Sequence, residues 1–495
     1  MYFPTLEEVK KLKKDLPSAP MESGLRQAGG NLVPVYREIV ADMETPVSAF
    51  LKIHRNDYSF LLESVEGGER LARYSFIGTE PYKVLSTKGK DKIDPLPLIA
   101  EELKWFKPVP VAGLPKFCGG AVGYLSYETV ARFEELPSPN PDPLGVPESL
   151  FMFVDTVLIF DHVTHKIKVL SHVHLDGDIE QEYQKAVKKI DELVDRLHQP
   201  LPPSKQARGT NPAATQSKPT SNFTKEAYMA VVEKVKKYIT AGEVIQVVPS
   251  QRLSQPTKAA PFDIYRALRT INPSPYMFYF DLGGEFFIIG ASPEILVRVE
   301  DGTVTTRPLA GTRPRGKTPE EDVRLEQELK GDEKERAEHI MLVDLGRNDI
   351  GRVSEPGSVE VSELMDVERY SHVMHLVTNV QGKLRKDMNA FDALRACFPA
   401  GTVSGAPKIR AMEIIAEVEP EKRGPYAGAA GYFSFNGNMD MAISIRTMVL
   451  SKGVAYTQAG GGVVYDSVPE KEYEETLNKA RALLNAISQA ESAGG

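Results

Sequence analysis

The chain has 495 residues, of which 26% are charged and 41% hydrophobic, and its formal net charge at pH 7 is −8. This length suits two domains or one large composite domain, and the acidic balance without a basic block argues against a nucleic-acid partner. Two distant cysteines, Cys118 and Cys397, fit no metal-ligand spacing and favour a reducing, cytoplasmic setting over a disulfide framework. The first residues resemble a polar helix rather than a signal peptide, and no apolar run has the length of a membrane span.

The first part of the chain is predicted to be rich in short strands. Residues 32–46 are predicted as a helix, because Pro34 suits a helix start and Pro46 a stop. Short apolar runs bounded by turn residues predict strands, and an alternating pattern near residue 180 predicts a helix. The strands are expected at 47–53, 58–65, 73–77, 82–86, 149–161 and 167–174, and the helix at 178–198.

A change in composition divides the chain. Residues 198–222 are rich in proline and polar residues, which is typical of a linker or a mobile loop. We therefore expect an N-terminal portion, 1–197, and a C-terminal portion, 223–495.

The C-terminal portion is predicted to alternate strands, loops and helices. Thr224 caps a helix with a 3.6-residue apolar stripe. Further predictions are a strand at 244–253, a hairpin within 276–299, a basic loop at 307–316, helices within 391–423 and three strands within 426–459, one of which, 441–450, carries Arg446. Together these elements indicate a mixed, largely antiparallel α+β fold.

Two helical stretches carry paired carboxylates. A helix is predicted at 332–349, where Glu335 and Glu338 share one face. A second helix near residue 470 places Glu472 and Glu475 on one face in the same way. If the two helices face each other, four carboxylates meet, and such oxygen ligands suit Mg²⁺. The alternative is two solvated helix faces.

Glycine-rich segments and one arginine indicate an anion site. The segments Gly311-Thr312, Gly401-Thr402 and Gly460-Gly461-Gly462 let backbone amides approach an anion, but none precedes the Lys-Ser/Thr of a phosphate loop. Arg446 could hold a carboxylate with two hydrogen bonds. Each residue alone also allows a structural role, as a bulge, an ion pair or a loop hydroxyl.

These segments resemble the motifs of the chorismate-utilising enzymes, and most closely those of the anthranilate synthase component I family. The resemblance covers nearly the whole length. It rests on Glu335-Arg-Ala-Glu338-His339, Pro308-Leu-Ala-Gly-Thr-Arg313, Gly401-Thr-Val-Ser-Gly-Ala-Pro407, Arg446, Gly460-Gly-Gly462 and Glu472…Glu475…Lys479. It implies two largely antiparallel sheets packed together with helices outside. It also implies a Mg²⁺-dependent lyase that converts chorismate and ammonia to anthranilate and pyruvate, the first committed step of tryptophan biosynthesis.

The resemblance also implies a role for each matching residue. Glu338 and Glu475 would bind Mg²⁺ directly, with Glu335 and Glu472 as outer ligands. His375 would act near the departing hydroxyl as a general acid or hydrogen-bond donor. Thr402 and Lys479 would complete the catalytic pocket, and chorismate would contact Gly311, Thr312, Tyr426, Arg446, Gly460, Gly461 and Gly462.

Two positions separate the members of this family. Relatives that add water have a lysine base where this chain has Gln246, and a neutral amide cannot take that role. Aminodeoxychorismate synthases have a nucleophilic lysine where this chain has Ala310. These residues favour anthranilate synthase, although aminodeoxychorismate synthase component I stays an alternative.

The chain lacks the motif of a glutaminase. Neither cysteine lies on a Gly-x-Cys-x-Gly elbow, so ammonia from glutamine would come from a glutamine amidotransferase subunit, anthranilate synthase component II. The sequence leaves open whether the two subunits form a heterodimer or a heterotetramer.

Two further segments resemble the tryptophan-binding elements of feedback-inhibited anthranilate synthases. Glu63 could pair with the ammonium group of L-tryptophan, and Tyr276 could pack against its indole. The full predicted site contains Leu62, Glu63, Ser64, Ser75, Pro275, Tyr276 and Met277. The alternatives are an ordinary strand at this position or, for the whole chain, a catalytically inactive tryptophan-binding module.

Overall fold

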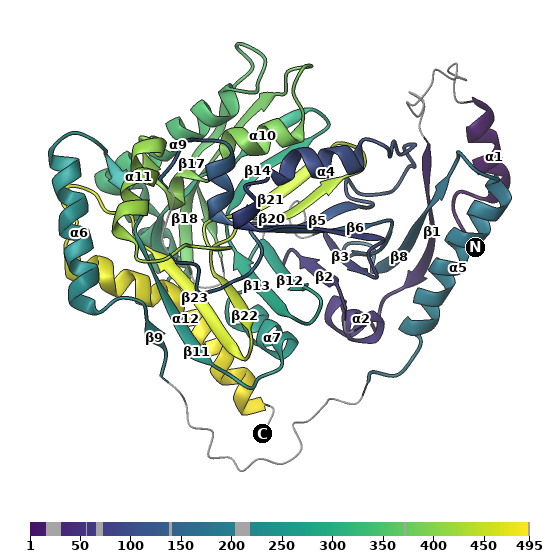
Figure 1. Ribbon diagram of the computed structural model, residues 1–495, viewed down its shortest axis with the longest axis horizontal. Coiled ribbons are helices and arrows are strands. Elements are labelled where there is room, and N and C mark those ends of the chain that lie inside the picture. Colours follow the sequence, from purple (N-terminus) through teal and green to yellow (C-terminus); the bar gives the residue numbers. More distant parts are fainter. Residues whose placement is uncertain are drawn as a thin grey trace.

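The computed structural model describes residues 1–15, 31–55, 57–65, 73–137, 141–202, 218–370 and 373–493. Residues 203–217 of the predicted linker and residues 371–372, just before His375, lie outside these ranges. Two large antiparallel sheets pack together, and helices cover their outer faces (Figure 1). The predicted α+β arrangement is confirmed.

The first sheet combines strands from both ends of the chain. Each strand pairs antiparallel with its neighbour. In spatial order the strands are β1 (Leu32–Val40), β8 (Lys166–His174), β7 (Thr156–Asp161), β3 (Tyr74–Thr79), β2 (Ser59–Glu63), β12 (Tyr276–Asp281), β13 (Phe286–Ser292), β22 (Thr447–Ser451), β23 (Val454–Gly460), β11 (Ser250–Pro256) and β9 (Thr220–Ser221).

The second sheet is built in the same way. Its order is β16 (Leu309–Pro314), β18 (Val373–Lys383), β15 (Thr303–Thr306), β14 (Ile295–Glu300), β21 (Met439–Ile443), β20 (Ala429–Ser434), β5 (Gly120–Leu125), β6 (Ser149–Val154) and β4 (Lys83–Thr87). β17 (Glu360–Arg369) also pairs with β18, and β10 (Gln246–Val247) forms a short ladder with β19 (Gly405–Ala406). The pairs β2–β12 and β5–β20 join residues 1–197 to residues 223–495, so the two portions share both sheets.

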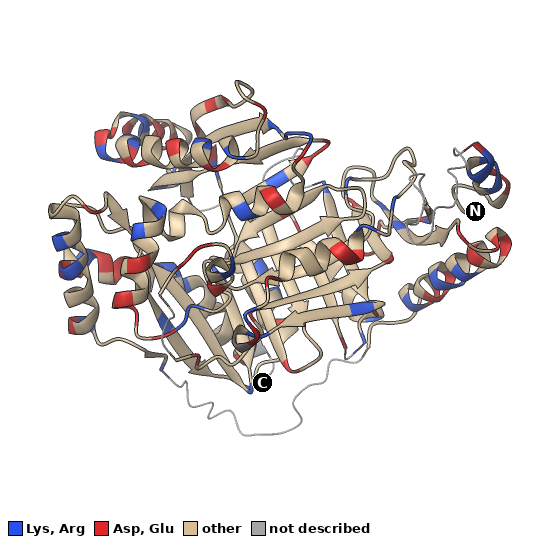
Figure 2. Ribbon diagram, turned by 45° about the horizontal axis from the view of Figure 1, so that its top comes forward, with Lys and Arg blue, Asp and Glu red and all other residues tan. Residues whose placement is uncertain are grey.

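Aromatic and aliphatic side chains fill the space between the sheets. Phe60, Val122, Phe280 and Ile288 are almost fully buried there. Burying each of these side chains contributes about 1.5–3 kcal/mol, so this layer stabilises the sandwich strongly. Figure 2 shows most charged residues on the outer helices and loops.

The helices pack on the outer faces. Against the first sheet lie α1 (Leu6–Asp15), α2 (Pro46–Ile53), α5 (Ile179–Leu197), α7 (Pro261–Ile271) and α12 (Pro469–Ala493). On the side of the second sheet lie α4 (Pro95–Leu103), α6 (Lys225–Thr240), α8 (Pro319–Gly331), α9 (Glu333–Gly351), α10 (Ala390–Cys397) and α11 (Lys408–Val418), with the short 3₁₀ helices η1 (Gly89–Asp91), η2 (Tyr127–Arg132) and η3 (Gly401–Val403). Within the described residues, none of the helices combines the length and apolar character that a membrane crossing requires.

Three predictions in the N-terminal portion are wrong. The strand expected at 149–161 breaks at Asp155 into β6 and β7, which belong to different sheets. Residues 32–40 form strand β1 rather than a helix, because Pro34 lies at the edge of a sheet, where a missing N–H is tolerated. Residues 46–53 form helix α2 rather than a strand. Thr45 accepts a hydrogen bond from Ser48 N and donates its own N–H to Ser48 Oγ, a capping box that decides the conformation of a short apolar run.

Four predictions in the C-terminal portion are also wrong. The strand expected at 244–253 is interrupted after Val247, and its parts β10 and β11 belong to different sheets. The loop expected at 307–316 contains strand β16, which lies at the edge of the second sheet. The strand expected at 441–450 breaks between β21 and β22, and Arg446 lies in the break with φ +50°. Residues 426–459 hold four strands rather than three.

Candidate active site

The helix with the first carboxylate pair is confirmed as α9. Its N-cap is Asp332, whose side chain accepts hydrogen bonds from the N–H groups of Lys334 and Glu335. The Glu335 carboxylate lies 3.1 Å from the Arg313 guanidinium of β16. Glu338, one turn further along, is half-buried, and burial together with the negative charges of Glu335 and Glu475 raises its pKa. Glu335 therefore has a cationic partner in direct contact, whereas the raised pKa of Glu338 results first from burial and then from two carboxylates, opposed by Lys479 and Lys334.

The second carboxylate pair begins helix α12. Glu472 is buried, its Oε2 atom has no hydrogen-bond partner, and burial with the nearby Glu475 charge raises its pKa. Glu475 Oε1 lies 2.6 Å from Lys479 Nζ. An ion pair of 3.3 Å between Lys334 and Asp466 links the start of α9 to the loop before α12. The two helices thus present their acidic residues toward the same region.

These four carboxylates do not converge into a ready-made ligand shell. Among the residues that the structure describes, no group of three or more His, Cys, Asp or Glu side chains is arranged to hold a metal ion. The chemistry of the site nevertheless fits a cation, since Glu472 Oε2 is buried without a partner, and burial together with the Glu335 charge raises the pKa of Glu338. The assignment of these residues to Mg²⁺ stays a prediction.

Arg446 and Lys479 form the cationic part of the site. Arg446 Nη1 donates to the carbonyl of Lys479 at 2.7 Å, and Lys479 Nζ donates to the carbonyl of Gly460 at 2.9 Å. Burial lowers the pKa of the Arg446 guanidinium, while Tyr426 and Glu475 oppose that effect. A guanidinium that is desolvated in this way gains from binding a carboxylate.

Two glycines permit close approach of the backbone to the site. A Cβ at Gly462 would lie 2.3 Å from Nε2 of Gln246, so any larger residue there would displace this side-chain amide. Gly311 has φ +68°, which favours glycine, and a Cβ there would meet the Glu335 carboxylate at 3.2 Å. Gly311 lies on β16 and Gly462 follows β23, so each glycine lets its segment approach a residue of the candidate site closely.

The hydrogen bonds of His375 define its tautomer. On β18, His375 Nδ1 lies 2.9 Å from the carbonyl oxygen of Gly311 and 3.1 Å from Thr312 Oγ1. A carbonyl oxygen can only accept, so Nδ1 carries the proton, and Nε2 of the neutral ring is then an acceptor. Burial, together with the Arg446 charge, lowers the pKa of His375 and favours this neutral ring. Donation from Nε2 would require a second proton.

A buried carboxyl group that the sequence analysis missed lies in the same region. Glu294 connects β13 to β14 and is only 5% exposed. Burial raises its pKa to about 8, although Thr402, the N–H of Leu309 and the Lys479 ammonium lower it. The group is therefore mostly protonated at neutral pH and can donate a proton. An acidic residue after Pro293, between two apolar runs, was the available signal.

Most of the predicted site residues are brought together. Lys479 contacts Arg446, Glu475 and Gly460, and it lies close enough to affect the pKa of Glu294. Tyr426 is buried beside Gly460, and burial raises its pKa to about 12. The site thus has an acidic side formed by α9 and α12, a cationic centre, and a protonatable carboxyl group.

A separate cavity of about 470 Å³ lies between the two sheets. Six of the seven residues predicted to bind tryptophan line it, namely Leu62, Glu63, Ser64, Pro275, Tyr276 and Met277. Ser75 lies opposite Glu63 on β3, but its hydroxyl pairs with His162 at 2.7 Å, and the residue does not line the cavity. The structure therefore brings together β2 and β12, from opposite sides of residues 198–222.

The polar groups of this cavity suit a zwitterion with an aromatic body. Glu63 Oε2 accepts hydrogen bonds from Arg269 and Tyr265, whereas Glu63 Oε1 is buried without a partner. The sequence analysis missed the cations and the aromatic wall of the cavity. The cations are Arg73, Lys116 and Arg298, and the rings are Tyr74, Phe76, Phe117 and Tyr432.

Comparisons with known proteins agree with this architecture. The family model for chorismate binding enzymes matches residues 57–485. The chain is 51% identical to the anthranilate synthase component 1 of Acetivibrio thermocellus, over 99% of each chain. The crystal structure of anthranilate synthase component I from Streptococcus pneumoniae superposes with a TM-score of 0.75 at 39% identity, covering 90% of this chain and 99% of that one. A menaquinone-specific isochorismate synthase from Escherichia coli shares the fold, with a TM-score of 0.69 at 20% identity over 97% of this chain and 98% of that one.

Proposed function

The chain belongs to the family of chorismate binding enzymes, and from this membership we propose that it is the large subunit of an anthranilate synthase. In this proposal it converts chorismate and ammonia to anthranilate and pyruvate, at the start of tryptophan biosynthesis in the cytoplasm. Near-full-length similarity at 51% identity to an anthranilate synthase component 1 carries the proposal. Gln246 and Ala310 support it, because neither can act as the lysine base or lysine nucleophile of the related activities.

The cationic centre would bind the substrate's carboxylates. Arg446, Tyr426 and the Gly460–Gly462 segment would hold one carboxylate, with Thr312 and Gly311 closing the pocket from β16. Mg²⁺ would supply Lewis-acid stabilisation at the ring carboxylate. Glu338 and Glu475 would be its direct ligands, with Glu335 and Glu472 behind them. Arg313 neutralises Glu335, which supports this order in the first pair. In the second pair the order follows the family resemblance alone, since Lys479 already pairs with Glu475 and Glu472 has the unpartnered oxygen.

Glu294 is the better candidate for the proton donor to the departing hydroxyl. Its raised pKa of about 8 keeps the carboxyl group protonated near neutral pH, and Thr402 lies beside it. A neutral His375 with its proton on Nδ1 instead offers an acceptor at Nε2. In this division of roles, Glu294 donates a proton when the hydroxyl leaves, and His375 accepts one when the ring becomes aromatic.

Ammonia from glutamine would come from a separate amidotransferase, anthranilate synthase component II. Burial raises the pKa of both thiols in this chain, that of Cys118 to about 12, so neither is available as the thiolate that a glutaminase needs. The purified chain should therefore use ammonium salts alone and glutamine only when the partner is present. Full glutamine-dependent turnover by the single chain would contradict this part of the proposal.

L-Tryptophan is proposed to occupy the 470 Å³ cavity as a feedback inhibitor. Glu63 Oε1, buried without a partner, would accept from its ammonium group. Arg73 or Lys116 would face its carboxylate, and the aromatic wall would contact its indole. Because both sheets contribute to the cavity, occupancy could bias how they pack.

A fluorescence assay tests the proposed activity directly. Anthranilate is fluorescent, so its appearance from chorismate and ammonium is expected to depend on added Mg²⁺ and to be accompanied by pyruvate. An aminated product that keeps its enolpyruvyl side chain would instead indicate an aminodeoxychorismate synthase. No turnover with either nitrogen source, with the partner present, would favour an inactive tryptophan-binding module.

A further inference from the structure

A buried guanidinium joins two of the segments that carry site residues. Arg423, after α11, has a side chain that is only 1% exposed. Its Nη1 donates to the carbonyl of Val403 at 2.7 Å, and its Nη2 donates to the carbonyl of Val248 at 2.6 Å. Val403 is adjacent to Thr402, and Val248 is two residues beyond Gln246. One planar group therefore closes the end of the short β10–β19 ladder.

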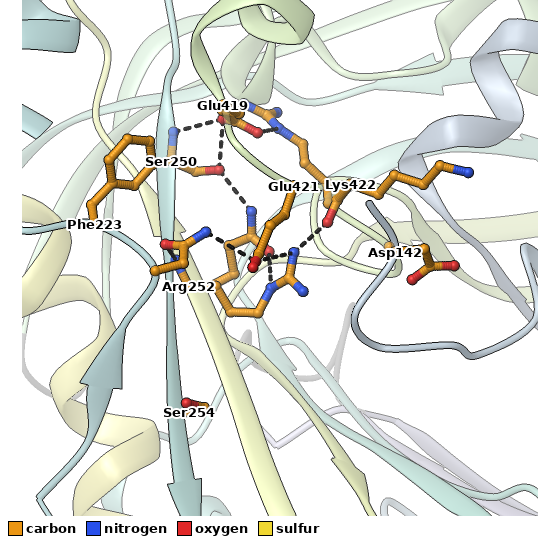
Figure 3. Close-up of polar contacts among 12 residues, drawn as sticks. Asp142, Phe223, Ser250, Arg252, Ser254, Glu419, Glu421 and Lys422 are labelled. Atoms are coloured by element: carbon orange, nitrogen blue, oxygen red, sulfur yellow. Dashed lines mark hydrogen bonds and ion pairs between the residues drawn. The ribbon is translucent and has the colours of Figure 1, made fainter. Parts of the chain in front are cut away.

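The orientation of this guanidinium is fixed from its other side. Arg423 Nε and Nη2 donate to the two oxygens of Glu419 at 2.9 and 2.6 Å. Glu419 Oε1 also accepts from the N–H and the hydroxyl of Ser250, each at 2.8 Å, as Figure 3 shows. A bidentate, fully buried pair leaves the guanidinium little freedom to rotate. Ser250 lies on β11, so the pair also holds the strand that follows Gln246.

Aromatic rings hold the guanidinium from the remaining directions. Its central carbon lies 4.6 Å from the ring centre of Tyr127 and 5.6 Å from that of Tyr426. Tyr426 is the phenol beside Gly460 in the site. On the main chain, the N–H groups of Arg423 and Gly424 both donate to the buried Glu128 carboxyl. Gln246, Thr402 and Tyr426 thus all lie next to groups that contact Arg423.

We propose that Arg423 is a positioning residue for the reaction, setting the spacing between the Gln246 segment, the Thr402 loop and Tyr426. The inference rests on the proposed function, because it assumes that ammonia and chorismate meet between these segments. Only the planar, forked guanidinium of arginine can make all of these hydrogen bonds together. The single nitrogen of a lysine could not reach both carbonyls and both oxygens of Glu419 at once.

The test compares Arg423→Lys with Arg252→Lys. Arg252 is a matched control on β11: it is 4% exposed and donates to Gln458 at 3.2 Å and to the carbonyl of Lys422. It reaches Glu419 only indirectly, through Gln458 and Ser250, and it makes no hydrogen bond to the main chain of the Gln246 or Thr402 segments. Both substitutions keep the charge and remove a buried planar group, so they should lower the melting temperature by similar amounts.

Steady-state kinetics with ammonium and Mg²⁺ give the decisive readout. For Arg423→Lys we expect kcat to fall at least ~10-fold and KM for ammonia to rise several-fold, since misplacement of about 1 Å can cost ~100-fold in rate. KM for chorismate should rise less than KM for ammonia, because Tyr426 packs on Arg423 whereas Arg446 makes no bond to it. Arg252→Lys should lower kcat clearly less than Arg423→Lys does, because it perturbs the same network through Gln458 but leaves the bonds to the Val248 and Val403 carbonyls in place.

Each outcome decides the inference. Wild-type kcat in Arg423→Lys, or equal losses of kcat in both variants, would show that Arg423 contributes only general stability. If Arg423→Lys does not fold, Glu419→Gln takes its place, and it should show the same rise in KM for ammonia if the inference is correct. Wild-type protein that forms no anthranilate would instead reject the proposed function, which separates the two failures.

Discussion

Replacing Glu294 by glutamine tests the chemistry of the site most directly. The amide is nearly isosteric and keeps a hydrogen-bond donor, but it cannot transfer a proton. If Glu294 is the acid, kcat should fall by about 10²–10⁴, the usual contribution of general acid catalysis. At a constant concentration of free ammonia, the wild-type rate should also decrease as the pH rises through about 8, where the carboxyl group ionises.

The same substitution has a calculable effect on stability. Burial raises the pKa of the Glu294 carboxyl from its ordinary value of 4.5 to about 8. The unfolded chain therefore releases the Glu294 proton at a lower pH than the native protein does. The free energy of unfolding should therefore fall as the pH rises from about 4.5 to about 8 and stay constant above that range. At about 1.36 kcal/mol per pKa unit, burial of this group costs about 5 kcal/mol above pH 8.

Urea titrations of wild type and Glu294→Gln at several pH values measure this cost. Because other groups titrate equally in both proteins, the difference between the two free energies isolates Glu294. It should favour the variant increasingly as the pH rises from 5 to about 8. A difference that does not vary with pH, or a variant with near-wild-type kcat, would refute the reasoning.

Further predictions follow from the other sites. Glu338→Gln should abolish activity more completely than Glu335→Gln, whose partner is Arg313, and the reverse order in kcat/KM would show that the inner and outer roles are exchanged. Glu63→Ala should raise the inhibition constant for tryptophan at least ~10-fold through loss of a charged hydrogen bond while sparing ammonia-dependent activity, and an unchanged constant would remove Glu63 from the inhibitor site. Phe60→Ala, between the sheets, should lower the free energy of unfolding by about 3–5 kcal/mol, and a loss below about 1 kcal/mol would show that the layer is not tightly packed.

Helix caps and prolines in the sequence correctly predicted those elements whose conformation depends only on neighbouring residues. Helix α9 could be recognised because Asp332 caps it and no proline interrupts it. Strand β1 could not be recognised from the sequence, since a proline such as Pro34 is tolerated in a strand only at the edge of a sheet, and the position of β1 in the sheet is not a local property. In α2, a capping box at Thr45 outweighed a run that resembles a strand, and periodicity alone does not separate the two for short apolar segments.

The same distinction applies to the site. The carboxylate pairs, Arg446 and the glycines could be put forward as site residues because their spacing is visible in the chain and resembles that of a known family, and their roles stay predictions. Glu294 could not be predicted, because its raised pKa depends on burial in the folded chain, and the residues that oppose the shift, such as Thr402 and Lys479, are distant in sequence. Arg73 and Lys116 were missed for the same reason, since their place in the cavity depends on how the sheets pack.

The sharing of both sheets between residues 1–197 and 223–495 has a consequence for synthesis of the chain. During translation, β2 and β5 emerge early, but their partners β12 and β20 are more than 200 residues further along. At about 5–20 residues per second, the edge of β2 stays unpaired for roughly 10–45 s. For that interval neither sheet can close, and the nascent chain exposes strand edges and the apolar faces that will later meet around Phe60 and Val122.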